Sequence, residues 1–175
     1  MNPVASPQAL CLLSSAPFDK SQRALLEEVC ARFDRVTLLL CGHDPFFSDE
    51  LRLQLVQEGC RHLAALQIRP FSEGASLRSA SGAPNAAVWL LEADPVAEAV
   101  RETDFPDLPF TRIPHVRVGS LCVNSPQIRQ LIRRRNIAAL AEWVPESTLD
   151  FLLSFEAKSV CHKIQSLPDP DPAAS

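Results

Sequence analysis

Glycine is scarce in this chain, which has five glycines among its 175 residues. They are scattered, so the chain contains neither a Gly-rich dinucleotide fingerprint nor a P-loop. Long apolar runs are lacking too, and those present are far shorter than the roughly 20 residues that span a bilayer. No basic segment precedes the short apolar run around Cys11, so no signal peptide is predicted. We therefore expect a cytoplasmic protein without a membrane partner.

An excess of positive charge is also missing. The chain has 17 Lys and Arg against 21 Asp and Glu, giving a net charge of −4, so composition gives no support for a nucleic-acid partner. The six cysteines are expected to be reduced in the cytoplasm. The pairs Cys41/His43 and Cys60/His62 lack the C-x-x-C spacing of structural zinc sites, so no metal site is predicted.

Buried strands and helices alternate in the first half of the chain. Helical patterns cover Lys20 to Phe33 and run from Ser48 to Gln57, with Gly59 as a stop signal. Ala9–Leu13 is a short continuous apolar run, typical of a strand buried on both faces. Val36–Cys41 is predicted as the second buried strand and Leu66–Ile68 as a third strand. This order predicts an α/β fold in which the three strands are adjacent and parallel.

The region Phe71–Pro114 is less regular. Ser, Gly and Ala predict a loop over Phe71–Pro84, whereas Ala87–Leu91 fits either a strand or part of a buried helix. Asp94–Arg101 is predicted as a short helix with Pro95 at its start, and Thr103–Pro114 as irregular. Val116–Val118 is the expected last strand.

The region from Val123 to Leu153 carries the strongest helix signals. Ser125 and Pro126 are predicted as the N-cap and first residue of a helix, which Arg133–Arg135 close and Asn136 ends. Pro145 permits a second helix to begin. We expect one domain over residues 9–165, with a flexible N-terminus over residues 1–8 and a Pro- and Asp-rich disordered tail over residues 166–175.

Two segments of this sequence resemble the citrate lyase ligase family, which belongs to the nucleotidyltransferase superfamily. The upstream segment shares Pro17, Phe18, Arg23, Asp34, Phe47, Ser48, Arg52, Leu55, Val56 and Gly59. The downstream segment shares Ile128, Arg129, Leu131, Ala138, Val144, Pro145, Thr148, Leu149, Phe151 and Leu152. The resemblance implies a Rossmann-like nucleotidyltransferase fold, with a parallel sheet flanked by helices and a C-terminal helical pair.

The resemblance also implies an activity. In that family ATP, with Mg²⁺, activates acetate as an adenylate, and the acetyl group passes to the thiol of the citrate lyase carrier subunit. The expected ligands of this chain are therefore a nucleotide and an acyl-carrier-type protein. The oligomeric state is not predicted.

The expected site lies beyond the carboxyl ends of the strands, where two helix starts direct backbone N–H groups into one crevice. The resemblance implies nucleotide contacts there from Phe18, Ser21, Gln22, Asn124, Ser125 and Arg129. Gln22 stands where the family has a catalytic histidine, and Asp19 replaces a threonine and also fits a simple helix cap. His43 follows the second strand and is a second catalytic candidate, with an exposed loop histidine as the alternative.

Several family positions differ in type, and Arg129 alone is kept in the second motif. The sequence thus leaves two alternatives to a diverged ligase. One is a non-catalytic binding or regulatory module that keeps the fold. The other is a nucleotidyltransferase with a repurposed site.

Overall fold

The structure is a computed structural model that describes residues 8–14, 16–70 and 87–167. The loop expected over Phe71–Pro84 lies outside these residues, as do residues 1–7 and 168–175 of the two expected flexible ends. Among the described helices, none is both long and apolar enough to cross a membrane.

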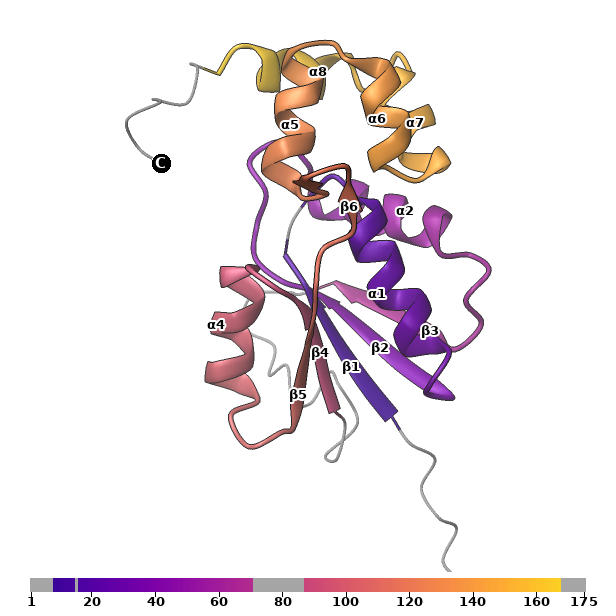
Figure 1. Cartoon of the computed structure of the whole chain (residues 1–175), viewed down its shortest axis with the longest axis vertical. Helices are drawn as coiled ribbons and strands as arrows, with labels where there is room; N and C mark the ends of the chain where they lie inside the picture. The colour runs from indigo at the N-terminus through magenta and orange to yellow at the C-terminus, as the bar shows by residue number, and fades with distance from the viewer. Residues whose placement is uncertain (1–7, 15, 71–86, 168–175) are drawn as a thin grey trace, which may run out of the picture.

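A five-stranded parallel sheet forms the centre of the fold (Figure 1). Its strand order is β3-β2-β1-β4-β5. The strands are β1 (Gln8–Leu13), β2 (Arg35–Leu40), β3 (Leu66–Pro70), β4 (Ala87–Leu91) and β5 (Phe110–Ile113). The predicted parallel neighbours β1, β2 and β3 are confirmed, and the ambiguous segment Ala87–Leu91 is a strand.

Helices cover both faces of the sheet. Alternate strand residues point to opposite faces, so Cys11 and Leu38 pack with α1 (Lys20–Cys30) and α2 (Asp49–Gly59) in the larger core cluster. Leu10 and Leu39 pack in the other cluster with residues of α4 (Pro95–Asp104). Figure 1 shows α1 and α4 on opposite sides of the strands. This burial on two faces explains the continuous apolar runs of β1 and β2.

Two predictions for the region before the C-terminal helices were wrong. Residues 110–113, expected to be irregular, form the edge strand β5. Its side chains are mostly exposed, so the strand lacks the apolar pattern by which β1 and β2 are recognised. The expected last strand does not join the sheet, because β6 (Arg117–Val118) pairs antiparallel with β7 (Leu121–Cys122) in a separate ribbon.

Between residues 125 and 167, the structure describes four helices rather than the expected pair. They are α5 (Ser125–Arg133), α6 (Ile137–Trp143), α7 (Glu146–Leu153) and α8 (Lys158–Gln165), and they lie beyond the carboxyl ends of the strands (Figure 1). Helix α5 packs on α6 and α8, and α7 packs on α2. The domain therefore has a helical layer above the edge of the sheet where ligands of this fold class bind.

Three predicted helix boundaries also needed correction. The N-cap of α5 is Asn124, so Ser125 is already helical. Arg135, with φ of 53°, takes the left-handed position, because Asn136 is needed as the N-cap of α6, where its side chain accepts from the Ala139 N–H. Gly59 is the last residue of α2 rather than a stop after it. A Cβ there would lie 2.7 Å from the ring of Phe18, so close packing requires glycine.

Candidate functional site

The topology places a crevice between β1 and β4. From β1 the chain crosses to β2 on one side, whereas β4 pairs with β1 on the other side. In open parallel sheets, ligands bind at such a switch point, outside the carboxyl ends of the strands. Two helix starts meet near this edge, because the Ser21 hydroxyl at the start of α1 donates to the carbonyl of Val123, just before α5.

A cavity of about 740 Å³ opens at this switch point. Its volume is within the range of small-molecule sites. We call it the switch-point cavity. It is lined by the ends of β1 and β4, by the connection after β5 and by the start of α5: Ser14, Leu91, Glu92, Ala93, Asp94, Pro95, Pro114, His115, Arg117, Cys122, Asn124, Ser125, Pro126 and Arg129.

The start of α5 offers a hydroxyl and an N–H to this cavity. The Asn124 side chain accepts from the N–H of Gln127 at 3.1 Å, and Pro126 has no N–H. The polar groups left for a ligand in the first turn of α5 are therefore the N–H and the hydroxyl of Ser125. Ser125 is 3% exposed, and its Oγ has no hydrogen-bond partner among the described residues. A buried hydroxyl at the positive end of a nine-residue helix suits an anionic group.

Arg129, one turn further along α5, also lines the cavity. Its Nη2 donates to the carbonyl of Ala16 at 2.9 Å and to the carboxylate of Asp44. The guanidinium lies over the ring of Phe46, 5.1 Å from its centroid. The side chain is 24% exposed, so Arg129 is fixed in position without being sealed from the cavity.

His115 and Asp94 complete the polar lining. The Nε2 atom of His115 lies 2.7 Å from the carbonyl oxygen of Glu92, which can only accept, so Nε2 carries the proton. Its Nδ1 is buried and has no partner within the described part of the chain. Asp94, in contrast, is fully used: it accepts from the N–H of Ser14, the hydroxyl of Ser14 and the N–H of Ala97. Arg117 and Arg129 supply positive charge to the lining.

The start of α1 is closed, unlike that of α5. Asp19 and Gln22 form a capping box, in which the Gln22 N–H donates to Asp19 at 2.9 Å and the Asp19 N–H donates to Gln22 at 3.1 Å. The Ser21 hydroxyl also accepts from the N–H of Val116 at 2.9 Å. Phe18 packs in the core against Gly59. Phe18, Ser21 and Gln22, three of the six nucleotide contacts expected from the sequence, thus do not line the switch-point cavity, whereas Asn124, Ser125 and Arg129 do.

Asp19 is a buried helix cap, as one of the two sequence interpretations had it. Its pKa is raised to about 7, chiefly by burial and also by the nearby charge of Asp94, while hydrogen bonds from the N–H groups of Gln22 and Ser21 act in the opposite direction. Its Oδ2 has no partner among the residues that the structure describes. The Asp19 carboxyl is therefore part of the interior rather than a group that faces a ligand.

His43, the other catalytic candidate, lies outside the switch-point cavity. Its side chain is 62% exposed, and its Nδ1 lies 3.4 Å from a carboxylate oxygen of Asp49. The neighbouring Asp44 contacts Arg129 instead. In the β2–α2 connection it is therefore Asp44, and not His43, that contacts a residue lining the cavity.

The sequence interpretation missed Glu92, Asp94, His115 and Arg117 as lining residues. A signal was present for Glu92 and Asp94, because polar residues that follow a strand lie at the ligand-binding edge once Ala87–Leu91 is taken as a strand. No such signal existed for His115. Its position depends on β5, an edge strand without an apolar pattern.

No group of three or more His, Cys, Asp and Glu side chains within residues 8–14, 16–70 and 87–167 is arranged to hold a metal ion. The carboxylate of Asp94, which lines the cavity, already accepts three hydrogen bonds from the protein. The site residues therefore do not fit a divalent ion held by the protein alone.

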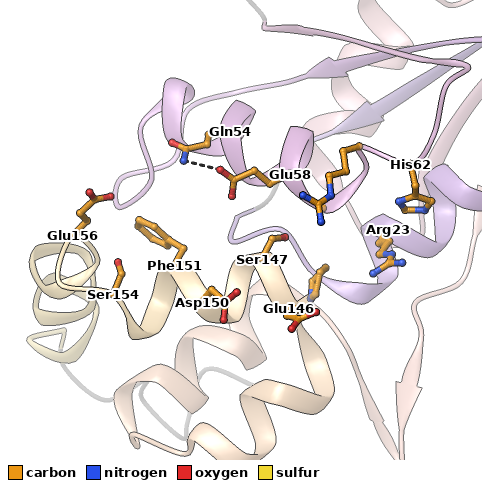
Figure 2. A pocket seen from close by; sticks show the side chains of 13 residues that line it. Arg23, Gln54, Glu58, His62, Glu146, Ser147, Asp150, Phe151, Ser154 and Glu156 are labelled. Carbon is orange, nitrogen blue, oxygen red and sulfur yellow. Dashed lines mark hydrogen bonds between the residues drawn. The ribbon is translucent and has the colours of Figure 1, made fainter.

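A second cavity of about 740 Å³ lies in a groove between α2 and α7 (Figure 2). In it Glu58 of α2 faces Ser147 and Asp150 of α7, and Arg23 and His62 lie toward one end. Both of these basic side chains contact Glu27. Four acidic residues line the groove: Glu58, Glu146, Asp150 and Glu156. They would repel the phosphates of a nucleotide, so this groove is the weaker candidate for an anionic ligand.

Fold and site together define a Rossmann-like α/β domain with its candidate site at the switch point. No protein-family model matches the sequence, and no curated protein matches it. Solved structures do match. One is a protein from Vibrio parahaemolyticus classed as a nicotinate-nucleotide adenylyltransferase, with 15% identity, a TM-score of 0.55, and coverage of 92% of this chain and 97% of that one.

A bifunctional NMN adenylyltransferase/ADP ribose pyrophosphatase from Francisella tularensis also matches, with 14% identity and a TM-score of 0.63. The match covers 91% of this chain and 52% of the bifunctional protein, so this chain corresponds to about half of it. The same protein in complex with AMP and a Mn ion matches with a TM-score of 0.62. At these identities the likeness shows the fold alone: a Rossmann-like α/β fold of the kind found in these adenylyltransferases.

Proposed function

We propose that this chain is a nucleotidyltransferase of the adenylyl-transferring type that binds an adenine nucleotide in the switch-point cavity. One observation carries the proposal: the start of α5 opens on a cavity at the switch point, with the fixed Arg129 and with a Ser125 hydroxyl that has no partner among the described residues. The solved structures support it, because they are adenylyltransferases and one holds AMP with a Mn ion.

In the proposed complex the phosphates lie at the start of α5. Ser125 donates through its hydroxyl and N–H, and Arg129 and Arg117 neutralise phosphate charge. His115 borders the same cavity, and its Nδ1 has no partner among the described residues. A divalent ion such as Mg²⁺ enters bound to the phosphates, since the described residues offer no metal-ligand cluster.

The proposed acceptor is a phosphate-bearing mononucleotide, which is the kind of substrate named for the similar structures. An oxygen of the acceptor phosphate forms a bond to the α-phosphorus of ATP. The bond from that phosphorus to the bridging oxygen breaks, and pyrophosphate leaves with the electron pair. This chain's part is to position both phosphates and to stabilise the charge that develops.

Turnover is expected to be slow. The side chain of Gln22 is committed to the capping box and replaces a catalytic histidine of the resembled family. A preorganised donor of this kind is typically worth about 10²–10³-fold in rate. The similar structures are adenylyltransferases rather than citrate lyase ligases, so they give no support to acetyl transfer onto a citrate lyase carrier or to a carrier-protein partner.

Calorimetric titration with ATP and Mg²⁺ tests the proposal. The wild-type protein should bind, and Arg129→Gln should weaken binding by about tenfold or more, because a charge-assisted hydrogen bond is lost. Arg61→Gln is the matched control: it removes the same charge from the α2–α7 groove and should leave the affinity unchanged. Absence of binding by the wild type, or an equal loss in Arg61→Gln, would refute the proposed site.

A product assay then separates an enzyme from a binding module. Wild-type protein is incubated with ATP, Mg²⁺ and nicotinamide or nicotinate mononucleotide, and both pyrophosphate and dinucleotide are measured. The two products are expected in equal amounts. Their formation, reduced in Arg129→Gln, supports transferase activity. ATP binding without product would favour a module that keeps the fold and the anion site.

A further inference from the structure

Asp44 is almost buried, with a side chain 5% exposed, and uses both carboxylate oxygens. Its Oδ1 accepts from the N–H groups of Phe46 at 2.9 Å and Phe47 at 3.1 Å, which folds the connection between β2 and α2 into a turn. Its Oδ2 accepts from Nη2 of Arg129. The turn therefore presents one oxygen of Asp44 to α5.

Arg129 is held from three directions. Its Nη2 donates both to Asp44 and to the carbonyl of Ala16, which lies in the connection after β1. The ring of Phe46 lies against one face of the guanidinium. Among the described residues, Nη1 donates to none, and Arg129 lines the switch-point cavity. One edge of the guanidinium is thus anchored while the other remains available.

We propose that Asp44 is a positioning residue of the phosphate site, holding Arg129 by its Nη2 edge so that Nη1 is directed to an incoming phosphate. This inference rests on the proposed function. Arginine side chains carry substantial rotamer entropy, and ordering one only when the ligand arrives reduces affinity. Asp44 orders Arg129 in advance.

The geometry favours positioning over competition between Asp44 and the phosphate. A carboxylate that competed with the phosphate would accept from Nη1, the nitrogen that the ligand needs. Asp44 instead accepts from Nη2, and so does the carbonyl of Ala16, which needs this hydrogen bond whether or not a ligand is bound. Asparagine cannot replace Asp44 here. It has a single acceptor oxygen, whereas Asp44 uses one oxygen for the turn and the other for Arg129.

The connection is expected to stay folded without the Asp44–Arg129 contact. Buried Arg52 donates to the carbonyls of Cys41 and Gly42 at 2.9 Å and 2.6 Å, and to that of Ser14 at 2.8 Å. These three bonds tie the ends of β1 and β2 to α2 independently of Asp44.

The experiment measures ATP affinity, with Mg²⁺, for wild type, Asp44→Asn, Arg129→Gln and the double variant. Asp44→Asn should bind about tenfold more weakly, because Arg129 is no longer ordered before binding. The double variant should bind no more weakly than Arg129→Gln alone, because Asp44 acts only through Arg129. A purely structural role of Asp44 would weaken binding further in the Arg129→Gln background. Asp107→Asn, a change of the same charge at an exposed turn residue, should match wild type.

Phe46→Leu provides a second test that leaves the Asp44 turn intact. It removes the ring beneath Arg129 and should weaken binding about two- to fivefold through the lost cation–π contact. The thermal unfolding transition shows whether Asp44→Asn folds. If it does not fold, Phe46→Leu becomes the deciding variant, and an ATP affinity of Phe46→Leu equal to that of wild type would overturn the inference.

Wild-type or tighter affinity in Asp44→Asn overturns the inference, and tighter affinity would mean that Asp44 competes with phosphate. In both cases binding by the wild type and its loss in Arg129→Gln leave the proposed function standing. No binding by the wild type refutes the proposed function itself and the inference with it.

Discussion

The starts of α1 and α5 are neighbours at one edge of the sheet, yet they differ in what their polar atoms contact. At α1 the capping box of Asp19 and Gln22 and the two hydrogen bonds of Ser21 consume the side chains. At α5 the hydroxyl of Ser125 has no partner among the described residues and borders a cavity. The same backbone feature thus supports the fold in one place and is available to a ligand in the other.

At the start of α1 the side chains bond each other, and this closes the start to ligands. The switch-point cavity is lined instead by the start of α5 and by Arg129, which Asp44 contacts from the connection after β2. Comparing the two starts by mutation tests whether this division is real.

The largest expected effects separate the two serines. Ser21→Ala should lower the free energy of unfolding by about 1–3 kcal/mol, because it leaves the N–H of Val116 and the carbonyl of Val123 without their partner. Ser125→Ala should change stability by less than about 0.5 kcal/mol, because its hydroxyl has no protein partner within the described residues. Urea denaturation measures both.

ATP affinity should show the reverse order. Ser125→Ala should weaken binding by up to about tenfold, the value of one hydrogen bond to a charged group, while folded Ser21→Ala should bind like wild type. The comparison fails if Ser21→Ala loses affinity while Ser125→Ala keeps it.

The next effect concerns pH and the closed start of α1. Burial raises the pKa of Asp19 to about 7 from its ordinary value of 3.8, so between these values the folded state holds a proton that the unfolded state has released. Stability from this group is therefore greatest below about pH 4 and decreases as pH rises toward 7, with a slope of at most about 1.4 kcal/mol per pH unit. Above about pH 8 the dependence should vanish.

Asp19→Asn is the matched variant, because asparagine is an equally good N-cap and does not titrate. Urea denaturation at pH 5, 6, 7 and 8 should show that wild type loses stability relative to Asp19→Asn up to pH 7. If the two proteins have parallel stability profiles, the Asp19 carboxyl does not titrate in this range, and its environment is more polar than the structure indicates.

Sequence patterns predicted those parts of the fold where burial leaves a strong mark. Strands β1 and β2 were recognised by their apolar runs because both of their faces are covered. The edge strand β3 keeps half-buried Leu66 and Ile68 although Gln67 and Arg69 are exposed, whereas the exposed edge strand β5 leaves no apolar pattern. The helix start at residue 124 was placed one residue late, since Asn124 and Ser125 are both good caps. Local sequence does not choose between them.

The candidate site was partly predictable for a related reason. Asn124, Ser125 and Arg129 were placed at the ligand-binding edge by helix signals and by the family resemblance. The pattern that identified Gln22 and Phe18 reports where they lie in the chain and not what they contact. Phe18 packs against Gly59, which is distant in the sequence, whereas Gln22 is bonded to Asp19 in a local capping box. The contact of Asp44 with Arg129 joins residues 85 positions apart, beyond the reach of any local pattern.

The smallest expected effect is that of His43→Ala, which tests the sequence-based choice of a catalytic histidine. The side chain is 62% exposed and lies 3.4 Å from the carboxylate of Asp49, so its loss should change the free energy of unfolding by less than about 0.5 kcal/mol. ATP affinity should stay within about twofold of wild type, because His43 does not line the switch-point cavity. His115→Ala, at a residue that does line it, should weaken binding more than threefold, about the lower limit for one lost hydrogen bond. A loss of affinity in His43→Ala equal to that in His115→Ala would mean that the β2–α2 connection moves toward the nucleotide on binding, and the contact between Asp44 and Arg129 would then have to break in the same step.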